Sequence, residues 1–239
     1  MSNPITRHIP NTLTCLNLTS GCIACLMAFG YRYELAFLFI VIGATFDFFD
    51  GMMARLLKAY SNIGKDLDSL ADMVSFGVAP SLIVYSLLRE MTASCAAGTF
   101  CSLLPYSAFL IAVFSALRLA KFNNDTRQTN SFIGLPVPAD ALFWASVAVG
   151  AHDLLMHPRF LPVYLLAVVI LFSGLLVSEI PMFSLKFKNL GWKDNKLRFL
   201  FLLVCIPLLV GLRTAGFAAI IVWYILLSLF TARPAKQNA

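Results

Sequence analysis

The sequence predicts an all-α integral membrane protein with about eight transmembrane helices. Of its 239 residues, 59% are hydrophobic and only 13% are charged, whereas a soluble domain carries roughly 25% charged residues. The apolar residues form long unbroken runs, which excludes the alternating pattern of a membrane β-barrel. Because the bilayer core offers no hydrogen-bonding partner to the backbone, such runs must be helical.

The apolar runs place the helices in order along the chain. We expect the first four at residues 11–29, 34–57, 61–88 and 103–122, and the last four at 138–151, 160–177, 199–212 and 215–232. Some of these are short for the ~20 residues that a span requires, so the last two are either spans or a re-entrant pair. No internal repeat or soluble segment is evident, and residues 1–239 are expected to form a single membrane domain.

The connections between these helices differ in composition. Residues 30–33 form a tight turn with aromatic side chains typical of the membrane interface. Small residues dominate the loop 91–102, and polar residues dominate the loop 123–134. The segment 178–198 is expected to lie at the membrane surface against anionic head groups. Its basic residues are Lys186, Lys188, Lys193, Lys196 and Arg198.

The basic residues predict the orientation of the protein. With the N-terminus in the cytoplasm, most lysines and arginines fall on the cytoplasmic side, as do both termini and the acidic motif described below. The residues that fall outside are Arg32, Arg89, Arg159 and Arg213. We therefore interpret the net charge of +6 as loop asymmetry and attraction to anionic membrane lipids, and not as nucleic-acid binding.

The cysteines indicate at most one disulfide. Cys22 and Cys25 have the spacing of a redox motif, but they lie inside an apolar run and are interpreted as small buried hydrophobic residues. Cys95 and Cys101 share a loop that the predicted orientation places outside. In an oxidising compartment these two residues could form a disulfide.

Two pairs of aspartates flank a short connection between two apolar segments. Asp47 and Asp50 are three residues apart and Asp68 and Asp72 are four apart, so each pair lies on one face of a helix. The intervening residues are long enough to reverse the chain. Folded as a helical hairpin, the two faces meet and present four carboxylates at one point.

Four carboxylates at one point repel one another unless a cation lies among them. Because every candidate ligand atom is oxygen, the sequence predicts a hard divalent cation, Mg²⁺ or Mn²⁺. Two such ions, roughly 4 Å apart, would hold a diphosphate and neutralise charge on a displaced phosphate. The motif therefore indicates a metal site.

The residues around the aspartates are suited to phosphate binding. Gly51 and Gly64 allow a phosphate to approach the backbone closely, and Arg55 can donate two parallel hydrogen bonds to phosphate oxygens. The site lies where a lipid head group would lie. These residues alone indicate phosphoryl or phosphatidyl transfer at the membrane surface.

The pattern Asp-x2-Asp-Gly-x2-Ala-Arg-x8-Gly-x3-Asp-x3-Asp resembles the signature of the CDP-alcohol phosphotransferase family without departure. Its fixed positions are Asp47, Asp50, Gly51, Ala54, Arg55, Gly64, Asp68 and Asp72. Segments 9–17, 68–80, 118–123 and 132–139 are similar to the CDP-diacylglycerol-dependent phosphatidylserine synthases of that family. The resemblance covers residues 5–190, and the last two helices carry little of it. Asp140 is a departure, since a small residue is expected there.

The resemblance implies an enzyme that transfers the phosphatidyl group from CDP-diacylglycerol to L-serine and releases CMP. It implies that Asp47, Asp50, Asp68 and Asp72 bind the metal ions and that Asp72 is also the general base. It further implies a homodimer. The residues expected to bind CDP-diacylglycerol are Gly51, Ala54, Arg55, Ser61, Gly64 and Asn11, although Asn11 alternatively caps the first helix.

Serine recognition requires residues outside the shared signature, because the family uses different alcohols. The carboxylate of serine requires a cation, and Arg118 and Lys121 lie near the cytoplasmic end of the fourth helix. Arg118 is alternatively a partner in a structural ion pair. Asn123 and Ser75 are weaker candidates for serine binding.

Two other functions are consistent with parts of the sequence. Another family member would use glycerol phosphate, inositol phosphate or choline in place of serine, which the segment 68–80 disfavours. A membrane transporter would use the acidic residues as an ion pathway. A transporter predicts acidic residues distributed through the depth of the bilayer, whereas here they cluster at one membrane edge.

Overall fold

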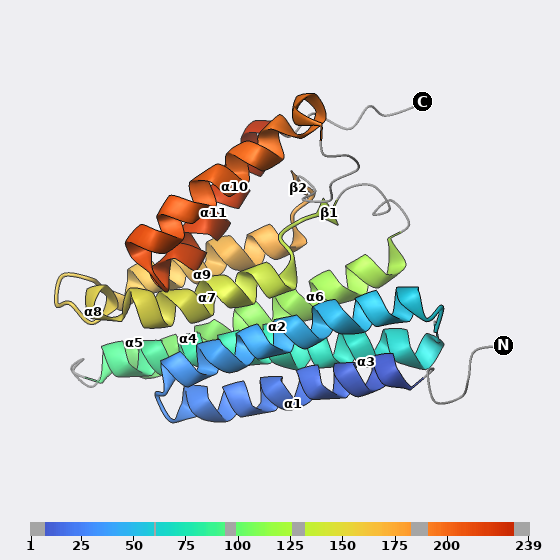
Figure 1. Ribbon diagram of the computed structural model, residues 1–239. Helices are drawn as coiled ribbons and strands as arrows, with labels where there is room; N and C mark the ends of the chain where they lie inside the picture. The colour runs from blue at the N-terminus through green and yellow to red at the C-terminus, as the bar shows by residue number, and fades with distance from the viewer. Residues whose placement is uncertain (1–7, 60, 94–98, 126–131, 183–190, 232–239) are drawn as a thin grey trace, which may run out of the picture.

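The protein is an elongated bundle of helices in the computed structural model, which describes residues 8–59, 61–93, 99–125, 132–182 and 191–231 (Figure 1). Helices α1 (Ile9–Phe29) and α2 (Tyr33–Leu56) form an antiparallel hairpin. The turn between them contains Tyr31 in the left-handed region, with φ of 55°. This confirms the tight turn that the sequence predicts.

The third predicted helix is one continuous span, Ile63–Thr92, with an irregular centre. It comprises α3 (Asn62–Asp72), a π-helical segment (Met73–Val78) and α4 (Ala79–Thr92). Ser61 caps its start, because its Oγ accepts a hydrogen bond from the Gly64 N–H at 3.0 Å. The π-helical segment begins directly after the last aspartate of the motif, and such segments are frequent at functional sites.

The fourth predicted helix begins earlier than residue 103 and is not uniform. A short α5 (Thr99–Leu103) leads into a 3₁₀ segment (Leu104–Ala108) and then into α6 (Phe109–Asn124). Pro105 at the start of the 3₁₀ segment has no N–H for a regular α-helical bond, which accounts for the change. The structure records Cys101 as disulfide-bonded, while its predicted partner Cys95 lies outside the described residues.

The next part of the chain is α7 (Val137–Gly150), the single turn α8 (His152–Leu155) and α9 (Pro162–Val177). The sequence did not indicate a two-residue antiparallel pairing of β1 (Phe132–Ile133) with β2 (Pro181–Met182). This pairing joins the segments that precede α7 and follow α9. It is too short to have a recognisable sequence pattern.

The last two helices are α10 (Trp192–Leu212) and α11 (Ala215–Thr231). Helix α10 begins at Trp192 and not at residue 199, and it is kinked at Asn195, where φ is −122°. The end of the predicted surface segment is therefore continuous with a span. Residues 183–190, with Lys186 and Lys188, lie outside the described residues. Helix α11 packs against α7.

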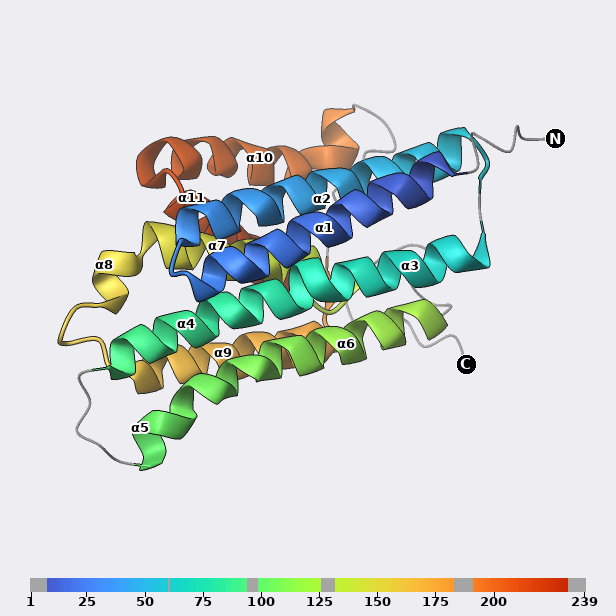
Figure 2. The ribbon, with the colours of Figure 1, turned by 90° about the horizontal axis from the view of Figure 1, so that it is seen from below.

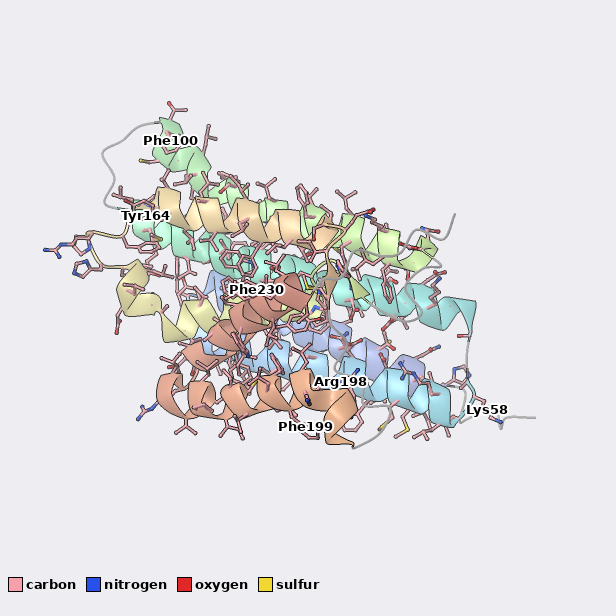
Figure 3. All side chains as sticks on the ribbon, turned by 90° about the horizontal axis from the view of Figure 1, so that it is seen from above. Lys58, Phe100, Tyr164, Arg198, Phe199 and Phe230 are labelled. Atoms are coloured by element: carbon pink, nitrogen blue, oxygen red, sulfur yellow. The ribbon has the colours of Figure 1, made fainter. Side chains whose placement is uncertain are left out.

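Within the described residues, five helices are long and apolar enough to cross a membrane. Three shorter apolar helices, α7, α9 and α11, complete the eight segments that the sequence predicts. Most helices run along one common direction, with α10 and α11 inclined to it in Figure 1, so the bundle has two ends (Figures 1 and 2). Lys58 lies at one end, and Phe100 and Tyr164 lie at the other (Figure 3). The structure thus confirms an all-α, multi-pass membrane protein.

Candidate functional site

The aspartates of the motif converge at the end of the bundle where α2 is followed by α3. Asp47 and Asp50 come from the last turns of α2, and Asp68 comes from α3. One carboxylate oxygen from each of these three residues lies within 4.8 Å of the others. Asp50 is buried, and Asp47 and Asp68 are partly buried. This is the convergence of opposed helical faces that the spacing predicts.

Asp72 lies one helical turn beyond Asp68 and next to Asp47. The buried guanidinium of Arg118, which belongs to α6, interacts electrostatically with Asp72. Asp72 is therefore adjacent to the carboxylate cluster and within electrostatic range of a buried cation. A group in this position can contact both the cluster and a second substrate.

Helix α1 supplies hydrogen bonds to two of the four aspartates. The Thr14 hydroxyl donates to Oδ2 of Asp50 at 2.7 Å, and the Asn17 amide donates to Oδ1 of Asp72 at 3.2 Å. Both α1 residues are buried. We did not assign Thr14 or Asn17 a role from the sequence. Their signal was two polar residues at i, i+3 on one face of an apolar helix, which is unusual within a membrane.

The position of Asn17 depends on close packing between α1 and the π-helical segment. The Ser75 hydroxyl donates to the backbone carbonyl of Asn17 at 2.9 Å. A Cβ added at Gly21 would lie 2.3 Å from Ser75 Oγ and 2.7 Å from Ser75 Cα. Only glycine permits this approach. Ser75 is thus a buried contact between helices.

Replacing Gly21 with alanine is expected to lower both stability and activity. The added methyl group would push α1 away from Ser75, and overpacking of this kind costs about 1–3 kcal/mol. The shift would also move Asn17 away from Asp72. The unfolding midpoint in detergent and the rate of CMP release would report the two effects. Gly174→Ala is the matched control, because a Cβ there meets nothing within 4 Å. Equal behaviour of the two variants would contradict the packing argument.

A pocket of about 210 Å³ opens beside the carboxylate cluster. Its walls come from the N-terminal part of α1, the end of α2 and the start of α3. They include five of the six residues predicted to bind CDP-diacylglycerol, namely Asn11, Gly51, Ala54, Ser61 and Gly64, together with Asp50 and Asp68. Two aspartates of the carboxylate cluster and the predicted phosphate-binding residues therefore line the same cavity.

Of two basic residues near this pocket, the one that lines it is Lys65, which had no predicted role, and not Arg55, which was predicted to bind phosphate. Lys65 lines the pocket, and its Nζ donates to the backbone carbonyl of Asn123 at 3.1 Å. The sequence signal for Lys65 was its place on the same helical face as Asp68 and Asp72, three and seven residues away. Arg55 is exposed and is not among the lining residues, so its predicted contact with a phosphate stays a prediction.

Gly51 lines the pocket, and a Cβ added at this residue would meet no atom within 4 Å. Gly51→Leu is therefore expected to fill the pocket without disturbing the fold, since glycine is about 1 kcal/mol less favourable than alanine or leucine in a helix. We expect the KM for CDP-diacylglycerol to rise about tenfold or more, as for a lost close contact worth about 1.4 kcal/mol.

The control for Gly51→Leu is Gly211→Leu on α10, where a Cβ likewise meets nothing within 4 Å. Steady-state CMP release at varied CDP-diacylglycerol would separate the two variants. A normal KM for Gly51→Leu would exclude this pocket as the site of the nucleotide lipid.

The four predicted serine-binding residues lie in different environments. Arg118 is 7% exposed, and its guanidinium stacks over the Phe122 ring at 4.8 Å from the centroid. Lys121 forms an ion pair with Glu179 at 3.2 Å. Asn123 donates to Ser69 Oγ at 2.7 Å, and Ser75 is the buried contact described above. Of these four described residues, Arg118 is the one that interacts electrostatically with Asp72.

Comparison with known proteins agrees with this geometry. The family model for CDP-alcohol phosphatidyltransferases matches residues 7–231. The chain belongs to the CDP-alcohol phosphatidyltransferase family. The matched region includes the last two helices, in which the sequence shows little of the motif. Members of this family are generally metal-dependent, in accord with the cluster of Asp47, Asp50 and Asp68.

Several relatives in this family carry the name CDP-diacylglycerol–serine O-phosphatidyltransferase. The chain is 40% identical over 132 residues to one from Bacillus subtilis, which is 55% of this chain and 70% of that protein. It is 36% identical to one from Helicobacter pylori over 56% of this chain and 54% of that protein. It is also 36% identical to one from Methanocaldococcus jannaschii, over 56% of this chain and 57% of that protein. The chain thus spans about half to two thirds of the length of these relatives.

Proposed function

We propose that this protein transfers the phosphatidyl group from CDP-diacylglycerol to L-serine, giving phosphatidylserine and CMP. The observation that carries the proposal is a carboxylate cluster beside a pocket with two glycines in its walls, next to Asp72, which interacts electrostatically with the buried Arg118. The pocket suits a lipid diphosphate, and the buried arginine suits the carboxylate of an amino acid. The names of the relatives support serine as the acceptor.

The pocket beside Gly51 and Gly64 would receive the CDP part of the nucleotide lipid. Neither glycine presents a side chain that would hold a phosphate away from the backbone. Lys65 would contribute a positive charge to the phosphates from the α3 side, and the Ser61 hydroxyl and Asn11 amide would contact the nucleotide. Because the site lies at one end of the bundle, the acyl chains would extend along apolar helix surfaces into the bilayer.

The carboxylates fit a divalent cation, because they are hard oxygen donors and three of them already lie within 4.8 Å of one another. Thr14 donates one hydrogen bond to Asp50 but carries no charge, so the negative charge of the cluster is left for a cation to balance. We infer that Asp47, Asp50, Asp68 and Asp72 hold Mg²⁺ or Mn²⁺, with two ions. Such ions, when bound, would neutralise charge on the diphosphate and on the departing CMP.

In the proposed reaction Asp72 accepts the proton of the serine hydroxyl. The serine oxygen then attacks the phosphorus that carries the diacylglycerol oxygen. The bond from that phosphorus to the bridging oxygen breaks, and CMP leaves with the bridging oxygen. Asn17 would keep the Asp72 carboxylate in one orientation through its amide hydrogen bond. The arrangement brings the two substrates together in one orientation, which lowers the entropic part of the barrier.

Arg118 would bind the carboxylate of serine. It is buried, it lies near Asp72, and within the described residues it has no carboxylate within 4.0 Å. A guanidinium can donate two parallel hydrogen bonds to a carboxylate, which would place the hydroxyl of serine toward Asp72. Lys121 is less suited to this role, because it already pairs with Glu179.

The acceptor would be tested with purified protein, CDP-diacylglycerol and one alcohol at a time. We expect CMP release with L-serine and background release with glycerol phosphate, inositol phosphate or choline. Release with one of these alcohols but not with serine would overturn the proposal while leaving the family intact. Absence of release with every alcohol, together with ion flux in proteoliposomes, would favour the transporter.

Removal of divalent metal is expected to abolish this activity reversibly. Without a cation the carboxylates repel the diphosphate, so CMP release should fall to background in excess EDTA. Addition of Mg²⁺ or Mn²⁺ beyond the EDTA concentration should restore it, whereas Ca²⁺, which prefers more ligands at longer distances, should restore it poorly. Full activity in EDTA after dialysis would exclude a metal-dependent mechanism.

We further propose a cytoplasmic-membrane protein with both termini and the site on the cytoplasmic side. Three basic residues, Arg55, Lys58 and Lys65, flank the turn between α2 and α3 at the aspartate end, as expected for a cytoplasmic end. Reporter fusions after residue 231 would test this orientation. The homodimer stays a prediction, which cross-linking in membranes would test.

A further inference from the structure

A second polar cavity lies at the opposite end of the bundle from the aspartates. Its volume is about 360 Å³. Tyr33 is the first residue of α2, whereas Asp47 and Asp50 lie in its last turns, so the two sites are about 20–25 Å apart at 1.5 Å per residue. The described residues that line it are Tyr31, Tyr33, Glu34, Glu90, Ala148, Val149 and His152. None of them has a role in the proposed transfer reaction.

Glu90 is held in place inside this cavity by Tyr33 and His152. The Tyr33 hydroxyl donates to its Oε2 at 3.0 Å, and Nε2 of His152 lies 3.3 Å from the same carboxylate. Tyr33 is 7% exposed, so its hydroxyl fixes Glu90 from the interior. These contacts join α2, α4 and α8. They orient the carboxylate without supplying a permanent positive charge.

The aromatic rings provide walls of a definite shape. The rings of Tyr31 and Tyr33 are 6.4 Å apart and perpendicular, at 90°, and the ring of His152 lies 5.6 Å from that of Tyr33. Tyr31 adopts a left-handed conformation to lie beside Tyr33. The faces of such rings carry partial negative charge and attract cations.

The charges of the cavity select a cation. Glu34 and Glu90 supply two carboxylates, and the described lining residues include no lysine or arginine. A metal ion is a poor fit to this cavity. Within the described residues, the three side chains whose ligand atoms lie close enough to hold one metal ion together are Asp47, Asp50 and Asp68, at the other end of the bundle. An ammonium group fits better, because its N–H donors reach separate acceptors and its charge can lie against the rings.

We propose that this cavity binds a primary ammonium group that carries no adjacent carboxylate. A carboxylate next to the ammonium group, as in serine or a serine head group, would be repelled by Glu34 and Glu90. At the membrane surface opposite the aspartates, the available ligands of this kind are ethanolamine head groups of lipids and free amines in solution. Both share the chemistry that the cavity recognises.

The test uses the full-length protein in detergent and short-chain lipids that differ only in head group. Binding would be measured by native mass spectrometry and by the shift in unfolding midpoint on titration. We expect saturable binding of the phosphatidylethanolamine, with the phosphatidylserine and phosphatidylglycerol of equal chain length about tenfold weaker or more, as for loss of one charged contact. Free ethanolamine is tested separately as a competitor of the phosphatidylethanolamine. Competition at a concentration similar to that of the lipid assigns the cavity to a free amine, and failure to compete assigns the cavity to a lipid.

Two variants connect the binding to the cavity. Glu34→Gln changes an exposed residue and should fold normally, while the pair Glu34→Gln and Glu90→Gln removes both charges. We expect a graded loss of ethanolamine-lipid binding, about tenfold for Glu34→Gln and a larger loss for the pair. Asp153→Asn is the matched control, because it removes an exposed acid of α8 that does not line the cavity. Unchanged binding in Glu34→Gln and in the pair, binding to all head groups alike, or no saturable binding would overturn the proposal.

Discussion

Replacing Asp72 with asparagine is expected to lower serine-dependent CMP release by about 10²- to 10⁴-fold, the usual contribution of a general base. Asparagine has nearly the same shape as aspartate, and its side-chain oxygen can still accept the hydrogen bond from Asn17 that Asp72 accepts at 3.2 Å. The packing of α1 on α3 should therefore survive. The amide cannot take the proton of the serine hydroxyl, so the loss should appear in kcat.

The control for this experiment is Asp66→Asn, which removes an exposed acid from the same helix. It should behave like the wild type. Binding of CDP-diacylglycerol, followed by the shift in unfolding midpoint, should be largely retained in Asp72→Asn, because the carboxylates of Asp47, Asp50 and Asp68 remain. A turnover close to wild type in Asp72→Asn would show that another group is the base.

The carboxylate cluster could be predicted from the sequence because its information is local. Spacings of three and four residues fix which face of a helix carries Asp47 and Asp50, or Asp68 and Asp72. The short connection between the two helices then makes them adjacent and antiparallel, which brings those faces together. The positions of Gly51 and Gly64 follow from the same hairpin, and both line the pocket beside the cluster.

The contribution of α1 could not be predicted in the same way. Whether Thr14 reaches Asp50 depends on how α1 packs against α2. Whether Asn17 reaches Asp72 depends on how closely α1 packs against the other side of the hairpin, where Gly21 lies against Ser75. Neither residue of that contact carries a local pattern. The π-helical segment Met73–Val78 was also missed, because its sequence is as apolar as that of a regular helix. Ser75, a weaker candidate for serine binding, is buried and donates to the Asn17 carbonyl, and its contact with a substrate stays a prediction.

Replacing Arg118 with alanine is expected to raise the KM for serine about 30-fold or more, since loss of one partner of a buried charge pair costs about 2 kcal/mol or more. The guanidinium is buried beside Asp72 and stacks on Phe122, so a serine carboxylate there would be shielded from water and strongly bound. The KM for CDP-diacylglycerol should change little, because Arg118 does not line the pocket of the nucleotide lipid.

Two further variants separate recognition of serine from a structural role of Arg118. Arg118→Lys keeps the charge but loses the second parallel hydrogen bond, so its KM for serine should lie between those of wild type and Arg118→Ala. Lys121→Ala removes a half-exposed cation that already pairs with Glu179, and it should leave both KM values nearly unchanged. A merely structural arginine would affect both substrates together, and Arg118→Lys would then restore both KM values to the extent that it restores stability. Equal increases in the two KM values would therefore remove Arg118 from the serine site and leave the acceptor to be recognised by groups on other helices.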